Sequence, residues 1–377
     1  MKALVFDRSL PRFAAAKLAG ALAPGRGAGP GPLKLKDVDP PDARGHDWHR
    51  VRPRLAGICG SDLSTIDGAT SRYFEPIVSF PFVPGHEVVG DLDDGTRVVV
   101  EPVLHCAIRG IEPVCHHCER GETNRCERVA FGHLEPGLQT GFCEDTGGGW
   151  STSMLAHDLQ LHRVPDDFTD EMAVMVEPTA CGLHAAHSIA EEHVVVLGAG
   201  TIGLCVIAAL EKPIVVVAAK HPVQRDLASS FGATVHGPDE IEGVVRRRTH
   251  SLKIGDQLTG GAQCVVDCIG SADSMQQALR IVAPGGTVYV VGMPSTVSLD
   301  LTGLWHREVT IRGVYAYTHA EFASAFDVVR AKRLDRLVSA AYPLDRWKDA
   351  IRHAAEAGRR GAVKVVFDLR DEKERNQ

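Results

Sequence analysis

The sequence has no long apolar run: no stretch of its 377 residues approaches the about 18 apolar residues that a membrane-spanning helix needs. It also lacks the apolar core of a signal peptide near its start, where Asp7 and Arg8 interrupt the hydrophobic residues. Basic residues are not in excess, because the formal net charge is −7, and this charge disfavours contact with nucleic-acid phosphates. The sequence therefore predicts a cytoplasmic protein that binds neither a membrane nor a nucleic acid.

No internal repeat with a period of about 20–50 residues is present, which argues against solenoids and propellers. The composition is otherwise that of a globular protein, with 44% hydrophobic and 24% charged residues, and the length suits two domains. Ten cysteines in a chain without an export signal favour free thiols and metal ligands over disulfides.

The first part of the chain, to about residue 150, is rich in short β-type runs. Residues 33–38, 48–56 and the valine run that ends at Val100 are predicted strands, each bounded by Gly, Pro or Asp. Between the first strands, residues 14–32 are rich in Ala, Gly and Pro, and we expect a flexible insertion there.

After about residue 180 the pattern changes to strands and helices in alternation. The predicted strands are 193–197, 214–217, 264–268 and 287–292, and the predicted helices are 201–210, 222–231 and 271–283. This alternation indicates parallel strands with right-handed crossovers, and the uninterrupted apolar strands suit a sheet covered on both faces. Helices at 320–331 and 344–357 and a strand at 362–368 follow. We expect a β-rich domain built from both ends of the chain and an inserted α/β domain.

A glycine motif joins the first strand of the α/β region to its first helix. Its residues are Gly198, Gly200 and Gly203, with Thr201 and Ile202 at the start of the helix. Glycines at this spacing allow a tight turn, a close approach of the backbone to a pyrophosphate, and close packing of helix on strand. Backbone N–H groups at the helix start then face the phosphates. The motif predicts a dinucleotide site.

The residues after the second strand distinguish the two nicotinamide cofactors. An NAD site needs an Asp or Glu there for the ribose 2′-hydroxyl, but this chain continues Ala-Ala-Lys-His without an acid. Lys220, His221 and Arg225 would instead attract a 2′-phosphate, although the same residues could be solvated surface charges. We predict NADP, with NAD as the alternative.

Four cysteines lie in a window of 21 residues: Cys106, Cys115, Cys118 and Cys126. Thiolates at this spacing can close a tetrahedron around Zn²⁺ with no open position, as in a structural site. The alternatives are a redox CxxC pair, disfavoured because no thioredoxin-like context surrounds it, buried core thiols, and a nucleic-acid-binding zinc ribbon, disfavoured by mixed charges without interleaved aromatics.

A second set of candidate ligands is dispersed: Cys59, His86, Glu87 and Glu177. Mixed Cys, His and Glu ligands with one position left for water or substrate are what a catalytic zinc needs. Taken singly, Cys59 would more often be a core thiol and His86 a turn histidine, so the interpretation depends on the pattern as a whole.

The combined pattern resembles the zinc-dependent medium-chain alcohol dehydrogenases and reductases, in particular the polyol and glucose dehydrogenase branch, over nearly the whole chain. The motifs that carry the resemblance are GICGSD (57–62), PGHEVVG (84–90), the four-cysteine lobe, EPTACGLHA (177–185), VVLGAGTIGL (195–204) and PGGTVYVVG (284–292).

The resemblance implies an α/β protein with a GroES-like β-rich catalytic domain and an inserted Rossmann domain with a doubly wound parallel sheet. The catalytic domain would comprise residues 1–180, with a structural zinc lobe at 101–130, and a return segment at 313–377, and the NAD(P)-binding domain residues 181–312. The family implies a cleft between the domains, interconversion of a small-molecule alcohol and a carbonyl, and a homodimer or homotetramer.

The resemblance also assigns roles to residues. Cys59 and His86 would bind the catalytic zinc, Glu87 is a ligand only in the polyol branch, and either Glu177 or Cys181 would complete the set. We favour Glu177 with a water, although both residues would lie on one face of a helix.

Three further features follow from the family. Ser61 matches the hydroxyl that bonds the substrate oxygen, and Gly270 and Gly292 would contact the cofactor. Many bacterial members have a proton-relaying histidine where this chain has Ser64, so the relay would run through the cofactor ribose and Ser64 or directly to water. Large apolar residues near Phe80, Trp150 and Trp305 could line the substrate pocket, although packing is the commoner role of such residues.

Two other functions remain open from the sequence. One is a zinc-independent enone or quinone reductase of the same superfamily, which retains only the structural metal. The other is a non-enzymatic binding protein on the same fold. The intact set of Cys59, His86 and Glu87 speaks against the first, because those relatives normally lack it.

Overall fold

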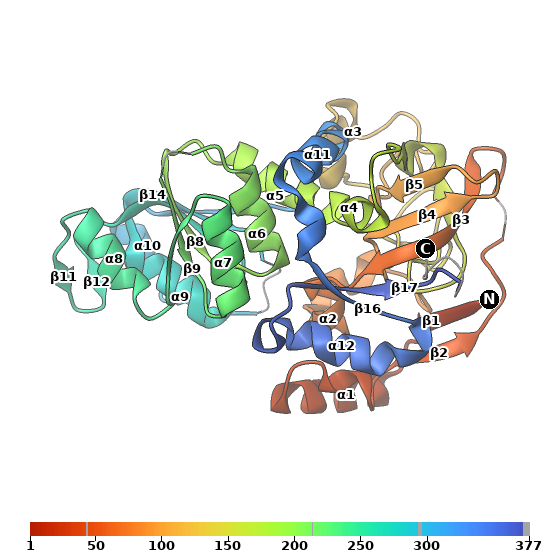
Figure 1. Ribbon diagram of the computed structural model, residues 1–377, viewed down its shortest axis with the longest axis horizontal. Coiled ribbons are helices and arrows are strands. Elements are labelled where there is room, and N and C mark those ends of the chain that lie inside the picture. Colours follow the sequence, from red (N-terminus) through yellow and green to blue (C-terminus); the bar gives the residue numbers. More distant parts are fainter. Residues whose placement is uncertain (43, 213, 293–295, 372–377) are drawn as a thin grey trace. The chain divides into compact units, whose positions relative to one another are not determined.

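The computed structural model describes residues 1–42, 44–212, 214–292 and 296–371 (Figure 1). The chain divides into two compact units: unit 1 comprises residues 1–177 and 317–377, and unit 2 comprises residues 178–316. These limits were predicted at residues 180 and 312. No helix among the described residues is long and apolar enough to cross a bilayer.

Unit 1 is built on a seven-stranded sheet of order β16-β17-β3-β4-β5-β7, with β6 also paired to β3. All pairs are antiparallel except β16 with β17. The strands are β3 Trp48–Gly57, β4 Val88–Leu92, β5 Arg97–Val100, β6 Met154–His157, β7 Leu161–Arg163, β16 Val338–Tyr342 and β17 Lys364–Asp368. Strand β17, from the end of the chain, pairs with β3, so both ends of the sequence form one sheet, as predicted.

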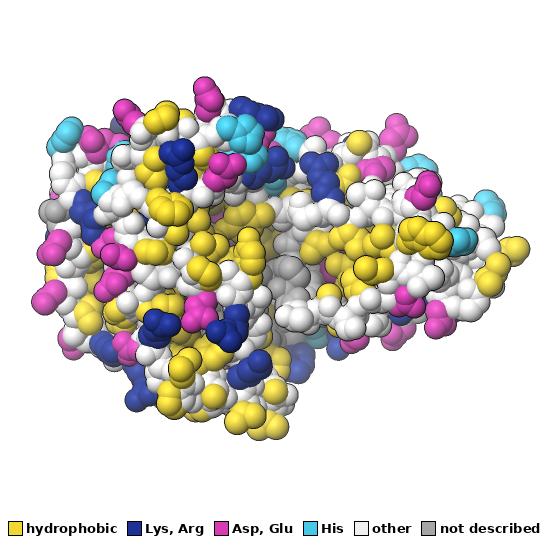
Figure 2. Space-filling model, turned by 180° about the vertical axis from the view of Figure 1, so that it is seen from behind, with side chains coloured by type: hydrophobic (Ala, Val, Ile, Leu, Met, Phe, Trp, Pro, Cys, Tyr) yellow, Lys and Arg dark blue, Asp and Glu magenta, His cyan; other side chains and the backbone are white. Residues whose placement is uncertain are grey.

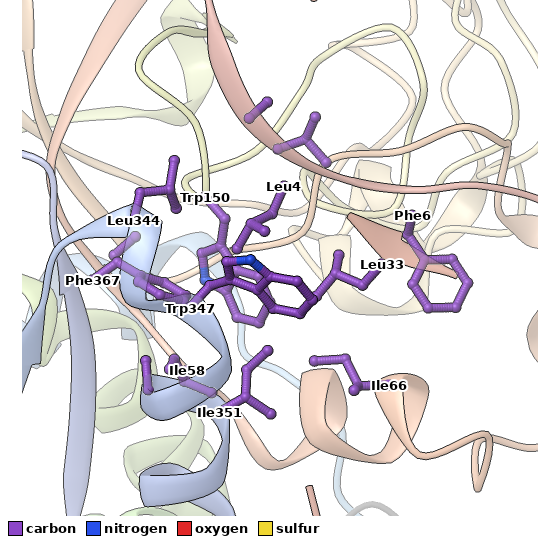
Figure 3. Close-up of a cluster of buried hydrophobic side chains, with 14 of the residues drawn as sticks. Leu4, Phe6, Leu33, Ile58, Ile66, Trp150, Leu344, Trp347, Ile351 and Phe367 are labelled. Atoms are coloured by element: carbon purple, nitrogen blue, oxygen red, sulfur yellow. The ribbon is translucent and has the colours of Figure 1, made fainter. Parts of the chain in front are cut away.

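A hydrophobic cluster in unit 1 joins distant parts of the sequence (Figure 3). Trp150 and Phe367 are fully buried there, with ring centroids 5.1 Å apart, and Trp347 of helix α12 packs in the same cluster. The antiparallel pair β1 (Lys2–Phe6) and β2 (Leu33–Asp37) supplies further members. Trp150 is thus a core residue, and its Nε1 donates to the Gly57 carbonyl at 3.0 Å.

The segment predicted as a flexible insertion is instead largely helical. Helix α1 covers Leu10–Leu22, and Pro11 in its first turn is compatible with a helix start. Alanine has the highest helix propensity, and this favours the helix although glycines follow it. Leu10, Leu18 and Leu22 are each more than 70% exposed, and hydrophobic side chains gather over this helix at the lower edge of Figure 2.

Helices connect the strands and loops of unit 1. They are α2 Gly60–Ile66, α3 His116–Glu119, α4 Asp170–Val174, α11 His319–Lys332 and α12 Trp347–Ala355, and α5 Val176–Ser188 begins at its boundary. Helix α11 starts at a capping box, in which the Thr318 hydroxyl accepts the Glu321 N–H and the Glu321 carboxylate accepts the Thr318 N–H.

Unit 2 contains a parallel sheet of six strands in the order β10-β9-β8-β13-β14-β15. The strands are β8 His193–Leu197, β9 Ile214–Ala218, β10 Thr234–His236, β13 Ala262–Asp267, β14 Val282–Val290 and β15 Thr310–Gly313, and β11 Lys253–Ile254 and β12 Gln257–Leu258 form a separate hairpin. This is the doubly wound order of a Rossmann fold, so the predicted fold class is confirmed.

The helices of unit 2 connect these strands: α6 Thr201–Ala209, α7 Pro222–Ser230, α8 Ile241–Arg248, α9 Ala272–Ile281 and α10 Thr302–His306. The sheet grows outward in both directions from β8 and β13, so right-handed crossovers place α6 and α7 on one face and α9 on the other. The carboxyl ends of β8 and β13 meet where the order reverses, and in such sheets ligands bind at this point.

Candidate metal and cofactor sites

Cys59, His86 and Glu87 come together at the ends of two paired strands. Cys59 follows β3 and is the N-cap of α2, while His86 and Glu87 directly precede β4. The Gly57 N–H donates to the Glu87 carbonyl at 2.8 Å, which fixes the two segments side by side. One ligand atom from each of the three side chains lies within 4.8 Å of the other two. The dispersed residues therefore form one donor set.

The buried carboxylate of Asp62 lies behind the imidazole of His86. The carboxylate accepts the Cys59 N–H through Oδ2 at 3.0 Å, and its Oδ1 lies 3.6 Å from His86 Nδ1. Neither of these last two atoms has a hydrogen bond among the described residues, although both are buried. Burial disfavours the imidazolium, but Asp62, Cys59 and Glu177 outweigh it and raise the pKa of His86 well above its ordinary value. The same anionic surroundings would attract a metal cation, which would have to displace the proton from His86 on binding.

Lys364 is a partner of this site that the sequence analysis missed. Its Nζ donates to Glu87 Oε2 and, at 3.3 Å, to the Ile58 carbonyl. Both charged side chains are only 1% exposed. Burial alone would lower the pKa of Lys364, but the Glu87 carboxylate raises it above its ordinary value. A lysine inside the apolar strand AVKVVFD was the signal available in the sequence.

Glu177 lies at the start of α5 and is 5% exposed. It accepts a hydrogen bond from the Tyr317 hydroxyl at 3.0 Å. Burial, reinforced by Glu87, raises the pKa of Glu177 to about 7, against the opposing effects of His86, Tyr317 and Lys364. Glu177 is not in the 4.8 Å group found among the described residues. Cys181 follows one turn later on the same helix.

Ser61 lies in the first turn of α2, two residues after Cys59, and is partly exposed. Its carbonyl accepts the Thr65 hydroxyl at 2.9 Å, so the backbone of this turn is held in place. Ser64 lies on the same helix.

The four cysteines of the 101–130 lobe converge. One sulfur from each of Cys106, Cys115, Cys118 and Cys126 lies within 4.8 Å of the other three, and Cys106 and Cys126 are 3.6 Å apart. Four thiolates at Zn–S distances of about 2.3 Å have a separation of about 3.8 Å, so this group fits a closed tetrahedral zinc site. Burial opposes ionisation, but backbone N–H groups of Glu127 and Cys118 lower the pKa of the Cys115 thiol to about 6.

Arg109 fixes the long loop between Cys106 and Cys115. Its side chain is fully buried, and its guanidinium donates to the carbonyls of Leu104, Phe131, Leu134, Glu135 and Gly137. Satisfying so many carbonyls with one cation holds the loop in a single conformation. The eight-residue gap between these two cysteines is accommodated in this way.

In unit 2 the glycine motif forms the turn between β8 and α6. Gly198 has a φ of +94°, and a Cβ there would lie 2.6 Å from the Ile269 side chain. A Cβ on Gly203 would lie 2.1 Å from the Gly198 carbonyl oxygen. Gly200 is the N-cap of α6, where a Cβ would face open space, and Thr201 begins the helix. The turn leaves room for a pyrophosphate at the helix N-terminus.

The segment after β9 contains the predicted 2′-phosphate contacts. Lys220 and Arg225 are exposed, and His221 is the partly exposed N-cap of α7. The Arg225 guanidinium donates to the Ala219 carbonyl at 2.9 Å, which keeps it next to the end of the strand.

Asp267 organises the turn after β13, and the sequence analysis did not identify it. The fully buried carboxylate accepts the N–H groups of Ile269 and Gly270 and the Ser274 hydroxyl at 2.8–3.2 Å. The Asp267 carbonyl accepts the Gly292 N–H at 3.0 Å. Both predicted glycines therefore lie at the carboxyl ends of the central strands, at the fold's ligand-binding edge.

Comparison with known proteins agrees with this architecture. Residues 45–166 match the family described as alcohol dehydrogenase GroES-like domain, and residues 197–331 match the zinc-binding dehydrogenase family. The chain belongs to the zinc-dependent medium-chain alcohol dehydrogenases. The predicted resemblance is thereby confirmed, and with it the assignment of the chain as an oxidoreductase.

Relatives of this dehydrogenase include an L-idonate 5-dehydrogenase and a sorbitol dehydrogenase. It is 27% identical to an L-idonate 5-dehydrogenase of Vitis vinifera, over 85% of this chain and 87% of that protein. It is 25% identical to a sorbitol dehydrogenase of Bacillus subtilis, over 86% and 91% of the two chains. The fold is similar to that of a candidate zinc-binding dehydrogenase from Sinorhizobium meliloti bound to NADP, with a TM-score of 0.71, 22% identity, and 97% and 98% of the two chains covered.

Proposed function

We propose that this dehydrogenase interconverts a polyol-type secondary alcohol and its ketone, with zinc in unit 1 and NADP(H) in unit 2. The observation that carries the proposal is the convergence of Cys59, His86 and Glu87 beside Ser61. The relatives named for idonate and sorbitol support the polyol class. The intact donor set argues against a zinc-independent enone or quinone reductase, and membership in a dehydrogenase family argues against a non-enzymatic binding protein.

The residues that would hold the catalytic zinc are Cys59, His86 and a carboxylate. We assign Glu177 as that carboxylate, because Glu87 already has a buried partner in Lys364. Glu87 then serves as a neighbouring anion that balances the positive charge of the site. Cys106, Cys115, Cys118 and Cys126 would hold the structural zinc.

When bound, zinc supplies a Lewis acid for the substrate oxygen, and the nicotinamide supplies or accepts the hydride. The protein's own residues orient the reactants and move the proton. In oxidation Ser61 Oγ would take the hydroxyl proton of the alcohol while it passes its own proton on toward solvent, and in reduction the same relay would run in reverse. The buried Asp62 carboxylate lies 3.6 Å from His86 Nδ1 and balances charge behind the ligand.

The cofactor would bind at the Gly198–Gly203 turn, with further contacts from the turns at Gly270 and Gly292. Lys220, His221 and Arg225 would contact the 2′-phosphate, and no acid in this segment competes for a ribose hydroxyl. We further propose a cytoplasmic homodimer or homotetramer.

The test is metal analysis of the purified enzyme together with a substrate screen. We expect two zinc ions per chain and turnover of polyols, or of their ketones, that depends on NADP(H). Simple aldehydes, sugars and enones serve as comparison substrates. One zinc per chain with turnover of enones only would instead establish the zinc-independent reductase, and absence of any turnover would contradict both.

The cofactor preference gives a separate prediction. Replacing Lys220 and Arg225 together by Ala removes two cationic contacts worth about 1.5 kcal/mol each, so NADP(H) binding weakens about 100-fold. NAD(H) binding changes by less than about threefold, because it has no 2′-phosphate. Fluorescence titration with both reduced cofactors measures the two affinities.

The matched control is Arg248→Ala, which removes an exposed arginine from α8 of the same unit. It leaves both affinities unchanged if the effect is local to the turn after β9. Equal affinities of the parent enzyme for NADPH and NADH would show that the cofactor assignment is wrong.

A further inference from the structure

A third group of metal-ligating side chains lies in unit 1, apart from the two sites described above. Glu101 directly follows β5, His162 lies in β7, and His319 is the first residue of α11. His162 Nε2 and His319 Nδ1 lie 2.9 Å and 2.7 Å from Glu101 Oε2. One ligand atom from each residue lies within 4.8 Å of the other two.

Two of these side chains are held rigidly. Glu101 is 3% exposed at its side chain and His162 is 12% exposed. Both polar groups of the Glu101 backbone are hydrogen-bonded to Gln160. The Glu101 N–H donates to the Gln160 carbonyl, and the Glu101 carbonyl accepts the Gln160 side-chain amide. The His162 ring packs at 4.6 Å from the Phe322 ring. A donor set with this support is preorganised.

The third side chain provides access from solvent. His319 is 57% exposed, and its ring lies 4.9 Å from that of His162. Ligand atoms about 2.0–2.1 Å from a tetrahedral ion are about 3.3 Å apart, so the two nitrogens need to move from Glu101 by about half an ångström. His319, which is exposed at the start of α11, can make its part of that adjustment, and the packed His162 needs the smaller movement because its nitrogen is already 2.9 Å from Glu101 Oε2.

We propose that Glu101, His162 and His319 form a binding site for a divalent transition ion such as Zn²⁺. Two imidazoles and one carboxylate are a favoured donor set for Zn²⁺ and Ni²⁺, and water would fill the remaining position. Each imidazole would present the ring nitrogen nearest Glu101 without its proton, which moves to the other ring nitrogen of a neutral imidazole or leaves to solvent from an imidazolium. The ion would join α11, from the return segment of the chain, to the sheet strands β5 and β7.

The test uses tag-free enzyme with its resident zinc, dialysed against metal-free buffer and assayed for zinc before use. Titration with NiCl₂ in a calorimeter is expected to show one additional equivalent in the parent enzyme. His319→Ala weakens that equivalent at least about tenfold, since it removes a ligand. His46→Ala, which removes a 93% exposed histidine of the same unit, leaves it unchanged.

Thermal unfolding provides the second measurement. The ion binds only the folded chain, so ZnSO₄ raises the melting temperature of the parent enzyme and of His46→Ala, but not of His319→Ala. No additional equivalent in the parent enzyme, or equal binding and equal stabilisation in His319→Ala, overturns the proposal. Because the comparison isolates the equivalent that depends on His319, its outcome does not depend on whether the catalytic zinc or the proposed substrate class is correct.

Discussion

Cys59→Ala is expected to reduce kcat/KM by about 1,000-fold or more, which corresponds to ~4 kcal/mol of transition-state stabilisation. The thiol is one of the donor atoms that converge with His86 and Glu87, so its loss leaves the site unable to retain the metal. NADP(H) binding is expected to stay within about threefold of the parent value, because the glycine turn lies in unit 2. Steady-state kinetics, metal analysis and cofactor titration together measure the effect.

The matched control is Cys143→Ala, which removes a buried thiol of unit 1 that is outside the metal-ligating groups found among the described residues. It should cost some stability but keep two zinc ions and nearly all activity. His86→Ala is expected to behave as Cys59→Ala does. Full activity of a Cys59→Ala enzyme that lacks the catalytic metal would refute the zinc mechanism.

Lys364→Met is expected to destabilise unit 1 by about 3–5 kcal/mol, because it leaves the Glu87 carboxylate buried without its cation. Urea unfolding followed by tryptophan fluorescence measures the loss, since Trp150 and Trp347 both lie in the core of this unit. The double variant Glu87→Gln with Lys364→Met should lose less than the single variant, because no buried charge remains unpaired.

Lys36→Met is the control for this comparison. Lys36 pairs with Asp7 at 2.7 Å in the same unit, but both side chains are more than a third exposed, so the pair contributes less than about 1 kcal/mol. If Lys36→Met and Lys364→Met lower the unfolding free energy equally, burial of the ion pair does not explain the contribution of Lys364 to stability.

The periodic parts of the fold could be predicted from the sequence alone. The strand at 193–197 and the helix that follows the glycine turn were placed almost to the residue, because apolar runs and glycines are local signals. Strand β14 was predicted to begin at 287, but it begins at Val282, since Pro284 and two glycines concealed its first half. Helix α1 was missed for a similar reason. The glycines and prolines of residues 14–32 indicated a flexible segment, although its alanines favour a helix.

The donor sets were predictable only where a motif contains them. Cys59 and His86 were found because each belongs to a recognisable segment. Lys364 and Arg109 were not found, because their partners are determined by tertiary contacts; Lys364 is 277 residues from Glu87 in the sequence. Such pairings depend on which strands meet in the sheet, and local sequence does not contain that information.

The pairing of β17 with β3 also determines the order in which the chain can fold during synthesis. Strand β17 lies at residues 364–368, so it leaves the ribosome after every residue of unit 2 has been made. Unit 2 is contiguous and can fold first, whereas the sheet of unit 1 must wait with an open edge on β3. Until Lys364 has been synthesised, the Glu87 carboxylate lacks the cation with which it pairs when it is buried. Nascent chains that stall before this point would therefore expose an unfinished sheet edge and are the species most at risk of aggregation.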